Sequence, residues 1–154
     1  QVQFSAGGSG PLRVQGARVR TYLLEKVRVT LSQGQLRERN FHIFYQACAA
    51  WTTWESRHRD KDMPDTLSGF EDTHKFQLLS RSKVHKLRSM DDALEFDRTL
   101  DAMKAVGFSD EEMAAVFHTV AGILHLGNLS FTRPKDNSEG SAIHQSAAGD
   151  LRTA

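Results

Sequence analysis

The sequence has only one cysteine, no uninterrupted apolar run long enough for a membrane, and almost no excess of charge. The single thiol, Cys48, excludes an internal disulfide and is typical of a reducing compartment. The longest apolar-looking stretch, residues 41–54, is broken by polar side chains, so no membrane span is expected. The net charge of +1 provides no overall field to attract polyanions. The composition is ordinary for a soluble protein, and 154 residues allow one domain at most.

The residue patterns of common catalytic centres are also missing. A P-loop needs Gly-Lys-Ser/Thr at the start of a helix, and no glycine here is followed by lysine. No Gly-x-Ser-x-Gly frames a nucleophilic serine. His118 and His125 lie about 10 Å apart by helix rise, too far for one ion, and neither His-x-x-x-His nor Cys-x-x-Cys occurs. The sequence therefore predicts no metal site and no catalytic residue.

Residues 107–131 carry the strongest local signal. Ser109 and Glu112 form the two ends of a capping box, which predicts where a helix begins. Gly127 can take the left-handed conformation that closes a helix. The apolar residues between them recur at helical spacing and predict one buried face: Met113, Val116, Phe117, Val120 and Leu124. A short strand should follow at residues 129–131.

The N-terminal third predicts a hairpin and a buried helix. Residues 16–24 alternate between apolar and polar, so we expect a strand that pairs with residues 2–4 across a turn at residues 7–11. Residues 41–54 are apolar nearly all round, which indicates a buried helix, with Asn40 as its cap. Cys48 on that helix is either a reactive thiol or, more commonly, a core residue.

The remaining elements are polar segments and one further helix. Residues 55–89 are expected to be loop with short ordered pieces, and the basic run within them is read as a solvated face rather than a phosphate site: Arg81, Lys83, Lys86 and Arg88. Residues 91–106 predict a helix that begins with a capping box from Ser89 and Asp92 and packs antiparallel to the next helix. The expected inward residues are Phe96, Leu100 and Met103 against Phe117, Val120 and Leu124. Residues 132–140 form a loop and 141–143 a returning strand, before a helix that starts at Ser146.

Three stretches resemble the myosin motor head, in the family's own order. They are GARVRTYLLEKVRV at residues 16–29, ERNFHIFYQ at residues 38–46, and GFS-x-E-E with LHLGN at residues 107–128. Two departures stand out: Val27 where the family usually has Ser, and Ala47-Cys48 where it usually has two Leu. The sequence 65–71 looks like the family's second switch, but it has one residue too many and precedes LHLGN, so we reject it.

The resemblance implies a fold class and a division of the chain. The expected fold is a fragment of an α/β P-loop NTPase motor head, mostly α-helical here, with a β-hairpin and a short C-terminal hairpin. The expected parts are a transducer hairpin at 2–29, a buried helix at 38–54, a polar loop region at 55–89, an antiparallel helix pair at 91–126, a surface hairpin at 129–143 and a truncated helix at 146–154.

The resemblance also implies a function for the complete head, an actin-activated ATPase motor. Its transducer couples nucleotide state to actin binding, and the matching residues here are Val19, Tyr22, Leu23, Glu25 and Arg28. Arg133 and Lys135 lie where a surface loop can touch actin, although an ordinary hairpin tip explains them equally well. ATP and Mg²⁺ belong to the complete motor, with none bound by this chain alone. The implied partners are the actin filament and the rest of the heavy chain, in the cytoplasm and on the cytoskeleton.

Two other functions were weighed against the motor. A helical protein-interaction module without motor activity would have a self-contained fold and only an accidental likeness. A nucleic-acid binder would use the N-terminal cations and bind with a steep salt dependence: Arg18, Arg20, Lys26, Arg28, Arg37 and Arg39. The near-neutral net charge argues against it, so no nucleic acid is expected as a partner.

Overall fold

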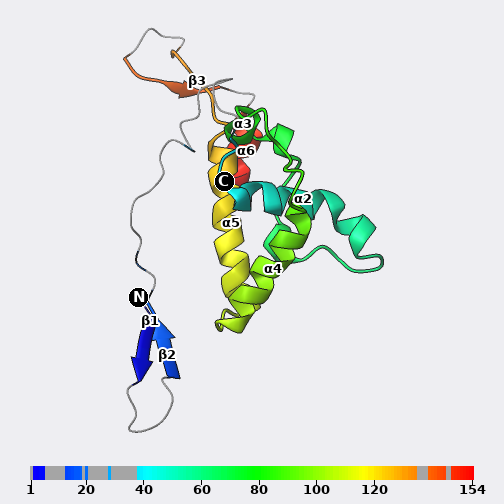
Figure 1. Ribbon diagram of the computed structural model, residues 1–154. Coiled ribbons are helices and arrows are strands. Elements are labelled where there is room, and N and C mark those ends of the chain that lie inside the picture. The colour runs from blue at the N-terminus through cyan, green and yellow to red at the C-terminus, as the bar shows by residue number, and fades with distance from the viewer. Residues whose placement is uncertain are drawn as a thin grey trace.

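This computed structural model describes residues 2–5, 13–18, 20, 28, 38–134, 139–144 and 147–154. Helices dominate it, and two small two-stranded sheets complete it (Figure 1). The elements in chain order are β1 (Val2–Ser5), β2 (Arg13–Ala17), α2 (His42–Arg57), η1 (Asp65–Leu67), η2 (Thr73–Lys75), α3 (Gln77–Ser80), α4 (Asp92–Ala105), α5 (Asp110–Leu126), β3 (Phe131–Thr132), β4 (Ala142–Ile143) and α6 (Ala148–Thr153).

The N-terminal hairpin is antiparallel, but its second strand lies earlier in the chain than the alternating pattern predicts. Val2 pairs with Ala17, and the register shifts by a bulge between Gln3 and Phe4. Strand β2 ends at Ala17, and neither Arg18 nor Arg20 is part of a strand, so the expected strand over 16–24 is wrong at these two residues. Residue 19 and residues 21–24 lie outside the described residues.

Helix α2 packs one broad side into the core. Its buried residues include Phe44, Tyr45 and Cys48, whereas Trp51 and Trp54 are only half-buried, so the helix is not enclosed all round. The predicted cap is wrong: Phe41 is the N-cap residue, and no side chain caps the helix. The side chain of Asn40 instead accepts a hydrogen bond from the amide of Phe41, at 2.7 Å.

The two long helices that follow begin with different caps. At α5 the predicted capping box is confirmed, with Ser109 Oγ accepting from the Glu112 amide and Glu112 Oε2 accepting from the Ser109 amide. At α4 the predicted box from Ser89 is wrong, because Asp91 caps the helix by accepting from the amides of Ala93 and Leu94. A carboxylate at the N-cap is favoured further by the positive end of the helix dipole.

Gly127 ends α5 in a way that the sequence does not predict. Its φ is −63°, which is right-handed, so the expected left-handed closure is wrong. Glycine is needed at position 127 because neighbouring atoms pack closely against its Cα. A Cβ at this position would lie 3.2 Å from the Leu124 carbonyl oxygen and 3.4 Å from Leu78 Cβ. The residue therefore lets α3 approach the end of α5.

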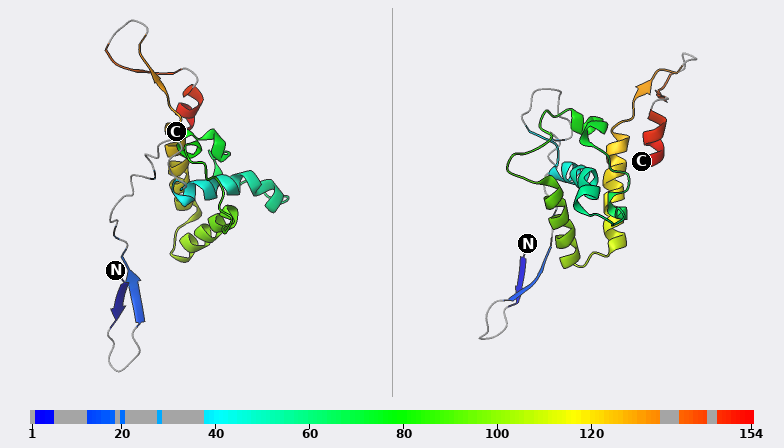
Figure 2. Two further views of the ribbon diagram at one scale, coloured as in Figure 1. Left: turned by 45° about the horizontal axis from the view of Figure 1, so that its top comes forward. Right: turned by 90° about the vertical axis from the view of Figure 1, so that its right-hand side faces the viewer.

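The arrangement of α4 and α5 also differs from the expected helix pair. The two helices run in opposite directions from the turn at Gly107 (Figures 1 and 2), and the rings of Phe96 and Phe117 meet edge to face at 4.9 Å. However, α4 packs mainly against α2, and α5 packs mainly against η1 and α6. Of the residues expected to face inward, Phe96, Phe117 and Leu124 are buried, while the other three are half-buried.

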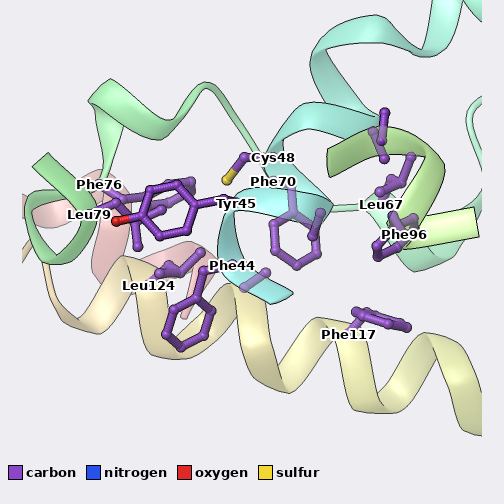
Figure 3. Packing of buried hydrophobic residues seen from close by; sticks show 14 residues of the cluster. Phe44, Tyr45, Cys48, Leu67, Phe70, Phe76, Leu79, Phe96, Phe117 and Leu124 are labelled. Atoms are coloured by element: carbon purple, nitrogen blue, oxygen red, sulfur yellow. The ribbon is translucent and has the colours of Figure 1, made fainter. Parts of the chain in front are cut away.

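The polar segment between α2 and α4 explains this difference. It was expected to be a loop region, yet four of its apolar side chains are almost fully buried: Leu67, Phe70, Phe76 and Leu79. Figure 3 shows them in one apolar cluster with Phe44 and Tyr45 of α2, Phe96 of α4 and Phe117 of α5. Helix α5 therefore packs on this segment, through η1, more than on α4.

The C-terminal elements are a small hairpin and a helix that packs on α5. Strands β3 and β4 pair antiparallel, as the returning strand at 141–143 predicts. Helix α6 lies so close to α5 that a Cβ on Gly122 would be 3.2 Å from the Ala154 carbonyl oxygen. None of the helices within the described ranges combines the length and apolar character that crossing a membrane requires.

The burial of Leu124 leads to a stability prediction. Its side chain is 0% exposed in the main cluster, so Leu124→Ala should lower the free energy of unfolding by about 2–5 kcal/mol through lost contacts and a cavity. Leu126→Ala, two residues away and 51% exposed, is the matched control and should change it by less than about 0.5 kcal/mol. Urea unfolding followed by circular dichroism measures both, and equal effects would contradict the packing described above.

Candidate functional site

A buried ion pair joins the residues before α2 to the first residue of α4. Arg39 is 2% exposed and Asp92 is 8% exposed. The guanidinium donates twice to the carboxylate, from Nη1 to Oδ2 at 2.8 Å and from Nη2 to Oδ1 at 2.7 Å. This bidentate geometry is the strongest form of a charge-assisted hydrogen bond. It fixes the position of residue 39 relative to the start of α4.

The neighbours of Arg39 complete its environment. Nε donates to His42 Nδ1 at 3.0 Å, and the guanidinium carbon lies 4.8 Å from the centre of the Tyr45 ring. Because His42 accepts at Nδ1, its ring is neutral in this arrangement. Burial and the positive charge of Arg39 both lower the pKa of His42, with a smaller contribution from Arg28. The neighbours of the ion pair, Tyr45 and neutral His42, therefore carry no charge that could replace Arg39 or Asp92 as a partner.

Two further hydrogen bonds hold the backbone beside Arg39. Arg28 Nη1 donates to the Arg39 carbonyl oxygen at 3.2 Å, and Ser82 Oγ donates to the Glu38 carbonyl oxygen at 2.9 Å. Arg28 belongs to the segment that resembles the transducer, so this contact connects that segment to the helices. We call Arg28, Arg39 and Asp92 the arginine junction.

A second polar cluster lies at the LHLGN end of α5. His125 contacts Asp150 Oδ1 through Nδ1 and the Gly69 carbonyl oxygen through Nε2, each at 2.8 Å. Asn128 donates to Asp150 Oδ1 at 2.9 Å and accepts from the Gln77 amide at 2.7 Å. The two polar residues of the motif thus connect α5 to α6, to α3 and to the turn at Gly69.

A cavity lies beside the arginine junction. It has a volume of about 650 Å³ and lies between α2, η2 and residues 85–93. Cys48 is on its wall but is 0% exposed, and burial, followed by the charge of Asp72, raises the pKa of its thiol well above the usual range. A thiol that stays protonated is a poor nucleophile, so Cys48 serves as a core residue.

The histidines have separate partners in the structure. His118 contacts Asp65, His125 contacts Asp150, and the rings of His74 and His85 lie 4.3 Å apart between their centres. Within the described ranges, no three side chains of the metal-binding types are close enough together to hold an ion. The basic run at residues 81–88 is exposed to solvent at each of its four cations.

The candidate residues taken from the sequence are only partly described. Val19, Tyr22, Leu23 and Glu25 lie outside the described residues, while Arg28 is half-buried in the arginine junction.

Of the two candidates for actin contact, Arg133 is exposed directly after β3, and Lys135 lies outside the described residues. The sequence did not indicate Asp92 or Asp150 as partners, because they lie 53 and 25 residues from Arg39 and His125. No local spacing relates residues so far apart.

Comparison with known proteins identifies the class of molecule. The family model of the myosin head (motor domain) matches residues 1–152. The chain belongs to the myosin head family. An accidental likeness, on which the interaction-module alternative depended, is thereby excluded.

Particular relatives agree with this assignment. The chain is 41% identical to Myosin-5 and 44% identical to Myosin-17 of Arabidopsis thaliana, each over 88% of its length and 8% of theirs. It is 37% identical to Myosin-14 of the same plant over 100% of its length and 9% of that protein. The chain therefore spans less than a tenth of the length of these relatives.

The arginine junction leads to a second stability prediction. Asp92→Asn would leave the buried charge of Arg39 without its counter-ion and should lower the free energy of unfolding by about 3–5 kcal/mol. Asp97→Asn is the matched control, since Asp97 pairs with Arg57 nearer the surface and should matter by about 1 kcal/mol or less. Urea unfolding measures both variants. A loss at Asp92 no larger than at Asp97 would show that the buried pair has no special role.

Proposed function

We propose that this chain is part of an actin-based, ATP-driven motor, and that its N-terminal segment couples nucleotide state to actin binding. The observation that carries the coupling proposal is the hydrogen bond from Arg28 to the Arg39 carbonyl oxygen. Arg28 lies in the transducer-like segment, and Arg39 is fixed to α4 through Asp92. A movement of that segment would therefore be transmitted to the helices.

The helices suit the part of a rigid body in such a mechanism. The main cluster contains side chains from α2, α4, α5 and the segment between α2 and α4. Close-packed interiors transmit displacement instead of absorbing it. In this proposal α2, α4 and α5 move as one unit when the motor changes state, in the manner of rigid-body allosteric transitions.

We propose further that ATP and Mg²⁺ are bound by parts of the motor outside this chain. Phosphoryl transfer needs a phosphate-cradling loop, a lysine and a metal ligand, and the chain has no Gly-Lys-Ser/Thr. Isothermal titration of the purified chain with Mg-ATP should therefore show no binding. Micromolar binding would contradict this part of the proposal.

For actin, we propose the β3–β4 hairpin as one contact. Arg133 is exposed directly after β3, and Lys135 lies two residues further along the sequence. Positive side chains at a hairpin tip suit an acidic filament surface. The proposed setting is the cytoplasm, in association with the cytoskeleton and the rest of the heavy chain.

The coupling proposal is tested in a complete motor domain that contains this chain. Val19→Pro would remove a backbone donor and prevent a central strand at that position. We expect ATP turnover without actin to persist and its acceleration by actin to be largely lost, as measured by steady-state turnover. Val19→Ile keeps a β-branched strand residue and is the matched control. A folded Val19→Pro motor with normal actin activation would contradict the transducer assignment.

A further inference from the structure

The ring of His125 is in an unusual hydrogen-bonding position. It is 4% exposed, and both of its nitrogens contact oxygen atoms: Nδ1 with Asp150 Oδ1 and Nε2 with the Gly69 carbonyl, both at 2.8 Å. A carbonyl oxygen can only accept a hydrogen bond, and an ionised carboxylate can only accept. A neutral imidazole has one donor and one acceptor nitrogen, so it cannot satisfy both contacts.

Asp150 is the acceptor in this contact. Its Oδ1 also accepts from Asn128 Nδ2 at 2.9 Å. Burial acts to raise the pKa of Asp150, but the hydrogen bonds from Asn128 and His125 outweigh it, and the pKa lies below its usual value. The carboxylate is therefore ionised at neutral pH.

We propose that His125 is held as a doubly protonated imidazolium. Its two N–H groups link α5 to α6 and to the turn at Gly69, and this link depends on pH. The proposal concerns a property of the LHLGN end of α5 and does not depend on the motor function proposed above. Its basis is the pair of acceptor atoms on opposite sides of one buried ring.

The charged groups around the ring support this assignment. From α6 the facing group is Asp150, and Arg152 lies two residues further on and is exposed. From the Gly69 turn the facing atom is the carbonyl, with the half-buried Glu71 and Asp72 following it in the chain.

The other neighbours that the structure describes place no charged group against the His125 ring. Phe76 meets it edge-on at 5.2 Å between centres, and Lys75 presents its backbone carbonyl to Asn128. Among the described residues, the charged group in contact with the His125 ring is thus the carboxylate of Asp150.

His118 provides a natural comparison on the same helix. Among the residues that the structure describes, only its Nε2 contacts acceptors, which are the Asp65 backbone carbonyl oxygen at 2.8 Å and the Asp65 carboxylate Oδ1 at 3.2 Å. A neutral ring with its proton on Nε2 satisfies these contacts. The side chain is also 43% exposed. His118 therefore has no need for a second proton, although it shares helix α5 with His125.

Loss of the proton from His125 has a defined structural consequence. A neutral ring keeps the stronger hydrogen bond, which is the one to the carboxylate. Its Nε2 lone pair then faces the Gly69 carbonyl oxygen and repels it. Gly69 has φ +80° and packs closely on α5, because an added Cβ would lie 3.3 Å from Ala121 Cβ. The turn at Gly69 should loosen first, while Asn128 still holds Asp150 and α6.

Nuclear magnetic resonance of the chain with ¹⁵N-labelled histidine tests the proposal. At pH 7 both ring nitrogens of His125 should show the chemical shifts of protonated nitrogen, and His118 on the same helix serves as the reference ring. Above the pH at which His125 loses a proton, amide exchange of Phe70 should rise at least tenfold more than that of Met113. An unprotonated ring nitrogen on His125 at pH 7 would overturn the proposal.

Asp150→Asn supplies an independent test. The substituted amide can turn its NH₂ toward Nδ1, so a neutral His125 ring would then be satisfied. The variant should show His125 neutral at pH 7, and its thermal midpoint should vary less with pH between 6 and 9 than that of the unchanged chain. An unchanged pH dependence would overturn the role given to Asp150, even if the variant is less stable overall.

Discussion

The buried pair of Arg39 and Asp92 is the interaction on which the arrangement of the helices depends. Removing two charges from water is costly, and the cost is recovered only when geometry and the remaining hydrogen bonds are both good. Here the pair is bidentate, and Tyr45 and His42 surround the guanidinium. Residue 39 and the first residue of α4 can therefore separate only at a large cost, so the entrances to α2 and α4 are fixed together.

The LHLGN end of α5 repeats this principle with different chemistry. His125 and Asn128 connect three segments through hydrogen bonds, while Gly122 and Gly127 allow α6 and α3 to approach closely. An arginine and a carboxylate hold the entrances to α2 and α4, and a histidine, an amide and a carboxylate hold the end of α5. Tyr45, which lies beside Arg39, and Phe76, which lies beside His125, both belong to the apolar cluster of Figure 3. Both polar clusters therefore border the same apolar cluster.

Local features of the fold could be predicted from the sequence, and distant ones could not. The capping box of Ser109 and Glu112 gave the start of α5 correctly, because cap and helix lie within four residues. The predicted packing of α4 mainly against α5 was wrong, because Leu67 and Phe76 occur in a polar segment without periodicity. The motif likeness identified the family, and its LHLGN stretch contains His125 and Asn128, but it did not predict their contacts. It did not reveal Asp92 or Asp150, whose partners are far away in the chain, and the roles of Tyr22 and Leu23 remain predictions.

A double-mutant cycle on the arginine junction tests the central claim most directly. The free energy of unfolding in urea would be measured for the unchanged chain, Arg39→Met, Asp92→Leu and the double variant. The account predicts that the double variant loses less free energy of unfolding than the two single variants lose together. This difference, the coupling energy, should be at least about 2 kcal/mol. A coupling near zero would mean that the two side chains act independently, and that the entrances to α2 and α4 are held by other contacts.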